Sequence, residues 1–375
     1  MGKLRKKEVN HLKTAYEKLF KHFKFVDALE MKNRLAMGPI LTYASRENGE
    51  ISDIDMSFYE KRVGGVSTVI IGPAFITENG QVAHGQIGIH CDQVIRKLHQ
   101  LTQMIHRRGA KAILQLSHGG RKCVEMENKW QAISPSEKSH KRKGKKPVQM
   151  TERDITYIVQ AFGEATTRAM EAGFDGVEID GGNECLLQQF ISRQANERSD
   201  SYGGSAENRF TFALEVIREV TRRAAHAGKP FIVGYTLAPK EKGYLGNKVE
   251  DTFEWIDRLV YTEIDYLHIS SLHEPTLSRE ENRSLLSSII KHVNHRVPLV
   301  GTGGLTATEV AEAFEQGLAL ITIEQALVVQ PDWVEKVINS DEPASMDMTS
   351  LNKDVSLPPE VLAHWQDMHK NDRPY

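Results

Sequence analysis

Short apolar runs alternate with helix-like segments along most of this 375-residue chain. Each run is followed by apolar residues at helical spacing, and the unit recurs eight times between about residue 34 and residue 324. Alternating strand and helix units predict a parallel sheet. Eight units at this length favour a closed (β/α)8 TIM barrel over an open sheet. An open sheet would carry a Gly-rich turn after its first strand, whereas this strand ends in Gly38-Pro39.

Element boundaries can be placed from strand runs and helix caps. Strands are predicted around residues 35–39, 68–71, 112–116, 176–179, 231–235, 266–269, 298–300 and 320–323. Capping-box patterns start helices at Ser52, Thr151 and Thr306, each with an acidic residue three positions later.

Three parts of the chain are expected. Residues 1–32 form an N-terminal arm, residues 33–339 the barrel, and residues 340–375 a polar C-terminal tail. Residues 117–150 make a long connection after the third barrel strand, and its basic run at residues 139–147 is typical of a solvated loop.

Composition excludes several partners. A net charge of −2 and a pI near 6.7 give no general attraction to nucleic acid or to membranes. No apolar run approaches the ~20 residues that span a bilayer. The three cysteines fit neither a disulfide framework nor a zinc site, which indicates a reducing, cytoplasmic location. A small-molecule substrate is the expected partner.

The segment 173–190 is the strongest candidate site. Its apolar run at residues 176–179 opens into Asp180, two glycines, Asn183 and Cys185. Active sites of such barrels are built at the C-terminal ends of the strands. A tight turn in which Asp180 or Asn183 caps the next helix is an equal alternative.

Two other strand ends carry residues that indicate ligand binding. Gln115 is a polar residue in a buried strand, and its amide can donate and accept at once, as the edge of a pyrimidine-like ring requires. The glycine-rich turn at residues 301–304 follows the seventh strand, where this fold usually binds phosphate. His268 is more simply a hydrogen-bonded histidine of the barrel interior.

Taken together, these motifs make the chain resemble the Old Yellow Enzyme family of FMN-dependent, NAD(P)H-oxidising ene-reductases. The resemblance covers roughly residues 19 to 336 and rests on residues 32–39, 64–65, 115–121, 173–190, 196–205, 301–304 and 331–333. It implies an oxidoreductase with FMN as cofactor and NADH or NADPH as reductant. Hydride would pass through the flavin to an α,β-unsaturated carbonyl compound. A homo-oligomer is compatible with this family.

The resemblance also implies roles for individual residues. The implied cofactor-binding residues are Pro39, Ile40, Leu41, Gly72, Gln115, Thr236, Gly303, Gly304, Glu324 and Gln325. The implied catalytic positions are Asp180, Asn183 and Cys185, with Tyr43 and His118 beside the substrate.

Several of these positions depart from the family pattern. Asp180 stands where the family has a carbonyl-binding His, and Cys185 where it has a proton-donating Tyr. Thr236 replaces an Arg beside the flavin, and Leu41 replaces a Thr or Cys. Glu324-Gln325 replaces the Gly-Arg pair that binds the phosphate.

Three interpretations follow from these departures. The first is an FMN oxidoreductase with altered or weak ene-reductase activity. The second is a catalytically degenerate barrel with weak or no FMN binding that serves as a binding or regulatory protein. The third is another barrel enzyme, with Asp180 as a base and Cys185 as a nucleophile or acid.

Overall fold

The computed structural model describes residues 17–26, 29–123, 130–138, 145–241, 249–270, 279–302, 307–339 and 362. Some predicted features lie outside the described residues, namely the glycines Gly303 and Gly304, the helix start at Thr306 and nearly all of the tail.

Eight parallel strands close into a barrel, as the alternating pattern predicts. They are β3 (Leu35–Met37), β4 (Thr68–Phe75), β5 (Lys111–Ser117), β8 (Gly176–Asp180), β9 (Ile232–Leu237), β10 (Tyr266–Ile269), β11 (Leu299–Thr302) and β12 (Leu320–Ile323). The barrel closes where the last strand pairs with the first, Thr322 opposite Ala36. A (β/α)8 barrel is therefore confirmed.

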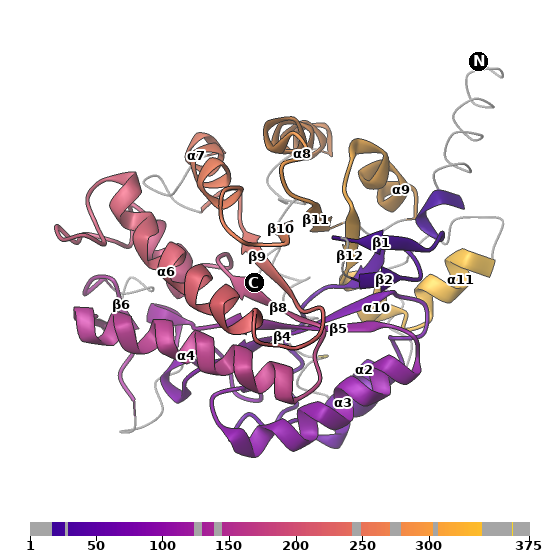
Figure 1. Ribbon diagram of the computed structural model, residues 1–375, viewed down its shortest axis with the longest axis horizontal. Coiled ribbons are helices and arrows are strands. Elements are labelled where there is room, and N and C mark those ends of the chain that lie inside the picture. Colours follow the sequence, from indigo (N-terminus) through magenta and orange to yellow (C-terminus); the bar gives the residue numbers. More distant parts are fainter. Residues whose placement is uncertain are drawn as a thin grey trace.

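Helices surround the strands (Figure 1). They are α2 (Asp53–Glu60), α3 (Ile95–Arg107), α4 (Glu152–Glu171), α5 (Leu186–Ile191), α6 (Ala206–Ala224), α7 (Val249–Leu259), α8 (Arg279–Val293), α9 (Ala307–Gln316), α10 (Gln325–Val329) and α11 (Trp333–Asn339). Among the described residues, no helix is both long enough and apolar enough to span a bilayer.

Two of the predicted capping boxes are present. The Ser52 hydroxyl accepts a hydrogen bond from the backbone N–H of Asp55, whose carboxylate accepts from the Ser52 N–H. Thr151 and Asp154 cap α4 in the same reciprocal way. Each box satisfies two of the backbone donors that a helix start leaves free, so the local sequence fixes where these helices begin.

A hairpin from the N-terminal arm packs at the end of the barrel where the strands begin. Strands β1 (Phe23–Phe25) and β2 (Leu29–Met31) pair antiparallel. The Phe25 ring lies 5.7 Å from the Tyr266 ring, centroid to centroid, and packs with a buried apolar cluster of the barrel interior. That cluster uses residues near the N-terminal ends of the strands, such as Ile113 and Ile232. The interior is therefore apolar near the N-terminal ends of the strands, and polar groups can gather near the C-terminal ends.

One strand is longer than the sequence suggested. We expected the second barrel strand to end at Ile71, but β4 continues through Gly72 to Phe75. Pairing with β5 shifts register between Ile71 and Ala74, and Gly72 there has φ +127°. A side chain at Gly72 would press on the backbone of Gln115, so only glycine keeps the two strands this close.

The long connection after β5 begins with the short 3-10 helix η3 (Gly120–Lys122) and carries a two-stranded sheet, β6 (Ile133–Ser134) and β7 (Val148–Gln149). Arg198 fastens this connection to the barrel. Its guanidinium donates to the carbonyls of Pro135 and Met150 and pairs with Asp200. Residues 139–144 of the basic run lie outside the described residues.

Candidate active site

A buried carboxylate lies in the barrel interior, in contact with side chains of several strands. Glu178 on β8 is fully buried and accepts four hydrogen bonds from side chains of three other strands. Gln115 Nε2 and Thr236 Oγ1 donate to its Oε1, at 2.8 and 2.6 Å. The Tyr266 hydroxyl and His268 Nδ1 lie 2.9 and 3.0 Å from its Oε2. All four carboxylate lone-pair positions thus have a partner, which a buried charge requires.

The contact between Glu178 and His268 favours the ionised form of both side chains. Burial alone would raise the pKa of Glu178, but the charge and hydrogen bond of His268 outweigh it, so that pKa is lowered. Burial would lower the pKa of His268, yet the carboxylates of Glu178, Glu324 and Asp180 raise it overall. Both shifts favour the ionised forms, a carboxylate in contact with an imidazolium. His268 is the hydrogen-bonded interior histidine that the sequence suggested.

Gln115 keeps one free hydrogen-bonding atom. Its Nε2 is committed to Glu178, while its Oε1 is buried and has no partner. An unpaired buried carbonyl costs free energy unless a ligand or water donates to it. Gln115 therefore offers an acceptor in the barrel interior.

Asp180 ties together the loop that follows β8. Its Oδ2 accepts from Ser117 Oγ at 2.8 Å, and its Oδ1 accepts from the Gly182 N–H and Asn183 Nδ2, both at 3.2 Å. Burial raises the pKa of Asp180 despite these hydrogen bonds. Asn183 adopts φ +55°, a left-handed conformation that Asn tolerates. The carboxylate thus holds one Asn183 N–H, and Asp180 offers only acceptor atoms when it is ionised.

Cys185 is a buried thiol at the N-cap of α5, with no capping hydrogen bond from its side chain. Ser117 Oγ lies 3.5 Å from its Sγ. Burial, followed by the Asp180 charge, raises the pKa of Cys185. A raised pKa disfavours the thiolate that a nucleophile needs, but it leaves the thiol form that an acid needs.

Glu324 brings another carboxylate to the same end of the barrel. It follows β12, and a side chain at Gly38 would collide with its carboxylate. Burial raises the pKa of Glu324 to about 7, and His268 and Glu178 act on it electrostatically. Gln325, the next residue, begins α10.

The remaining predicted residues follow the C-terminal ends of β3 and β5. Pro39, Ile40 and Leu41 follow β3, and only Ile40 among them is fully buried. Tyr43 has φ +53°, and burial raises its pKa to about 12. His118 is buried against Gly80 and accepts at Nδ1 from the Gly120 N–H, while its Nε2 has no partner.

Sequence reasoning missed Glu178, because an acidic residue in an apolar run was absorbed into the strand. A signal was present, since Glu178 and Asp180 are two positions apart in β8 and side chains alternate between the two faces of a strand. Gln115 and Ser117 repeat that spacing on β5. Paired polar residues at a spacing of two on neighbouring strands indicate a polar barrel interior.

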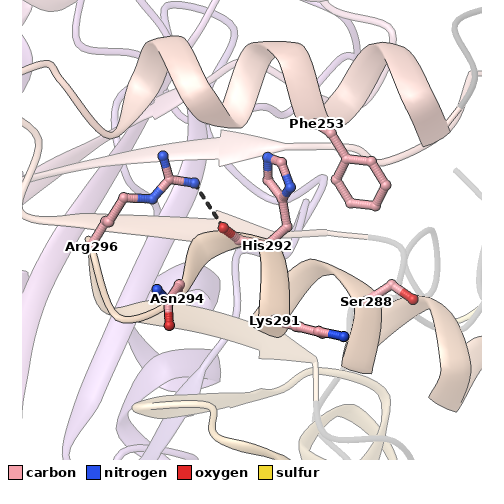
Figure 2. Close-up of a pocket in the computed structure, with 6 residues that line it drawn as sticks. All are labelled: Phe253, Ser288, Lys291, His292, Asn294 and Arg296. Carbon is pink, nitrogen blue, oxygen red and sulfur yellow. Dashed lines mark hydrogen bonds between the residues drawn. The ribbon is translucent and has the colours of Figure 1, made fainter.

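A separate depression of about 660 Å³ lies on the outside of the barrel, between α7 and the end of α8 (Figure 2). Phe253, Ser288, Lys291, His292, Asn294 and Arg296 line it. Arg296 donates to the His292 carbonyl and to Asp257, and the Phe253 and His292 rings are 4.6 Å apart. These contacts stabilise the end of α8, and the depression is not part of the barrel interior.

The barrel matches known proteins over nearly its whole length. A family model described as "NADH:flavin oxidoreductase / NADH oxidase family" matches residues 18–342. The chain is 37% identical over 329 residues to the "Probable NADH-dependent flavin oxidoreductase YqiG" of Bacillus subtilis, covering 86% of this chain and 88% of that protein. Its fold superposes on morphinone reductase with a TM-score of 0.75 at 23% identity, covering 90% of this chain and 96% of that structure.

A larger relative shares only the barrel. The "NADH:acrylate oxidoreductase" of Vibrio harveyi is 33% identical over 327 residues, which is 84% of this chain but 33% of that protein. The chain therefore spans about a third of that relative, whereas it spans most of the Bacillus protein. The match to the family model covers well over half of the chain, and so the chain belongs to the NADH:flavin oxidoreductase / NADH oxidase family, the Old Yellow Enzyme family that its sequence motifs predicted.

Proposed function

We propose that this FMN-dependent NAD(P)H oxidoreductase reduces the C=C bond of neutral α,β-unsaturated carbonyl compounds, and does so weakly. Members of the family are oxidoreductases that use FMN with NADH or NADPH. A bound FMN would supply the hydride-transfer chemistry between the nicotinamide and an electron-poor carbon. What this chain adds is a particular set of side chains around that chemistry.

The observation that carries the proposal is the free Oε1 of Gln115. It is a buried acceptor without a partner, as the N–H of a flavin pyrimidine edge requires. Gln115 would hold that edge, with Thr236 and His268 beside it through their shared contact with Glu178. Pro39, Ile40 and Leu41, after β3, and Gly72 in β4 would contact the ring. The residues present therefore fit a flavin at its pyrimidine end.

The proposed low activity comes from the residues that would bind the carbonyl group of the substrate. The family grips a carbonyl oxygen with two donors, but Asp180 offers only acceptor atoms while ionised. It also takes one N–H of Asn183 for itself. Cys185, at the position of the proton-donating Tyr, is buried and already lies close to Ser117 and Asn183. Negative charge developing on a bound carbonyl therefore meets one donor and a nearby carboxylate.

The same carboxylates favour neutral acceptors. Two of the relatives are named for acrylate and fumarate, which carry negative charge. Asp180 and Glu324 would repel such acceptors, whereas an uncharged enone avoids that cost. We therefore propose that neutral enones are preferred over unsaturated carboxylates.

Restoring the family side chains should raise the activity. We expect Asp180→His, alone or with Cys185→Tyr, to increase the kcat for 2-cyclohexen-1-one on the order of tenfold, because a donor replaces an acceptor at the carbonyl. The measurement is anaerobic NADH or NADPH consumption with and without added FMN, with the saturated ketone quantified. Wild type should show slow turnover that needs FMN.

Asp180→Asn is the matched control, since it removes the charge and keeps the size. It should lie between wild type and Asp180→His. Turnover that stays unchanged in all three variants would mean that the acceptor binds elsewhere, and turnover that persists without FMN would contradict the proposed function.

A further inference from the structure

His268 and Thr236 occupy neighbouring positions in the barrel. They are register partners across β9 and β10, and both side chains contact Glu178, one on each carboxylate oxygen. Gln115 contacts the same carboxylate from β5. A ring system held by Gln115 and passing over Thr236 would therefore also lie beside His268.

Charge balance makes His268 distinctive in this group. Thr236 is neutral and spends its hydroxyl hydrogen on Glu178. Gln115 and Tyr266 are neutral donors to the same carboxylate. The negative charge of Glu178 is thus balanced within this cluster by the imidazolium of His268 alone. Thr322 on β12 lies 3.5 Å from its Nε2, so the second ring nitrogen is only weakly engaged.

We propose that His268, held as an imidazolium by Glu178, supplies the positive charge at the flavin's pyrimidine edge that the family takes from an Arg at the position of Thr236. This rests on the proposed use of FMN at Gln115. Negative charge gathers at the N1–C2 carbonyl region of a flavin, and a cation beside it strengthens binding. The cation here comes from the neighbouring strand and can lose its proton, which an arginine does not do.

A pH dependence follows from that difference. The groups that act on His268 are the carboxylates of Glu178, Glu324 and Asp180, and together they outweigh burial and raise its pKa. The imidazolium is present below that raised pKa and disappears as pH rises through it, so FMN affinity should fall in the same direction. Glu324 gains charge near pH 7 and changes the affinity with the same sign.

The experiment therefore compares four proteins at several pH values above 7, where the FMN phosphate is already fully ionised. The dissociation constant for FMN is measured by quenching of flavin fluorescence in wild type, Glu324→Gln, His268→Gln and Tyr266→Phe. Glu324→Gln removes the contribution of that carboxyl. Tyr266→Phe removes one neutral donor to Glu178 and serves as the control for a damaged network.

The proposal predicts three results. His268→Gln weakens FMN binding about 10- to 100-fold, the range of a lost charge-assisted contact, and leaves only the shallower pH dependence that comes from Glu324. Glu324→Gln keeps a fall in affinity with rising pH. Tyr266→Phe keeps the profile of wild type. The imidazole signal of His268, followed by NMR in the FMN-free protein, should titrate above the usual pKa of histidine.

Other results separate the two proposals. If wild type binds FMN and His268→Gln binds it equally well with the same profile, His268 is not the cation, while the proposed function stands. If the FMN affinity of Glu324→Gln does not depend on pH, the inference is wrong as well. This variant tests the inference with His268 itself left intact. If wild type does not bind FMN at all, both proposals are wrong.

Discussion

Replacing Glu178 with alanine is expected to destabilise the protein by about 3–5 kcal/mol, the usual cost of removing one partner of a buried ion pair. The change leaves the imidazolium of His268 without its counter-ion and leaves Gln115, Thr236 and Tyr266 without their acceptor. Urea unfolding of the FMN-free protein, followed by circular dichroism, measures the loss.

A double-mutant cycle isolates the ionic part. In Glu178→Ala the buried imidazolium is unpaired, so adding His268→Leu should recover part of the lost stability because an uncompensated charge disappears. If the double variant is less stable than Glu178→Ala by the full effect of His268→Leu alone, the two side chains do not interact and our description of the interior is wrong.

The pH dependence of stability has a definite sign for each partner. The pKa of His268 is raised in the folded protein, so its contribution is fully present below the unfolded pKa and is lost as pH rises through the folded value. The pKa of Glu178 is lowered, so its contribution is present above the unfolded value and is lost as pH falls through the folded one. The pair therefore stabilises the barrel most at pH values above the unfolded pKa of Glu178 and below the unfolded pKa of His268.

Replacing Arg62 with methionine should cost about 2–5 kcal/mol, because three buried carbonyls lose a donor. Arg62 is fully buried at the end of α2 and donates to the carbonyls of Leu327 and Val328 in α10, at 2.9 and 3.2 Å. It also donates to the Phe58 carbonyl, with the guanidinium 4.0 Å from the Phe58 ring centroid. Methionine fills much of the space but donates nothing.

Arg108→Met is the matched control. Arg108 is half exposed and pairs with exposed Glu60 at 3.4 Å, a contact worth at most about 1 kcal/mol. A loss at Arg62 no larger than the loss at Arg108 would show that the carbonyls of α10 find other donors. Because α10 begins directly after Glu324, loosening it should also weaken FMN binding.

Local chemistry explains why the barrel was predictable from the sequence. Apolar runs of strand length recur with helical segments between them, and capping boxes such as that at Ser52 place helix starts within a residue. The hairpin β1–β2 was missed because its strands are three residues long and its burial comes from the end of the barrel where the strands begin, which no local pattern reveals. The extension of β4 was missed because it depends on the close approach of Gly72 to β5.

The candidate site was only partly predictable for the same reason. The strand-end rule brought Gln115, Asp180 and Cys185 to one end of the barrel. It could not show that Gln115 donates to Glu178 and leaves its carbonyl free, since that depends on contacts between strands 63 residues apart in sequence. Nor could it show that Asp180 draws in Asn183 and Ser117. Hydrogen-bond direction among buried polar groups is a tertiary property.

These contacts suggest how the departures from the family pattern are compatible with one another. Thr236 replaces a charged residue but keeps a hydrogen bond to Glu178, and His268 balances that carboxylate. Asp180 replaces a donor but satisfies the loop around Gly182. Thr236, His268 and Asp180 thus have partners within the interior, and the unpaired Oε1 of Gln115 is an open acceptor for a flavin edge.

The most direct test of this account is an FMN titration of the dialysed, FMN-free protein, monitored by flavin absorbance and fluorescence. We predict saturation at one FMN per chain, with affinity weakened about 10-fold or more in Gln115→Leu, where the acceptor is lost. Wild-type protein that takes up no FMN, or a Gln115→Leu variant that binds it as tightly as wild type, would contradict the assignment of the barrel interior as the flavin site.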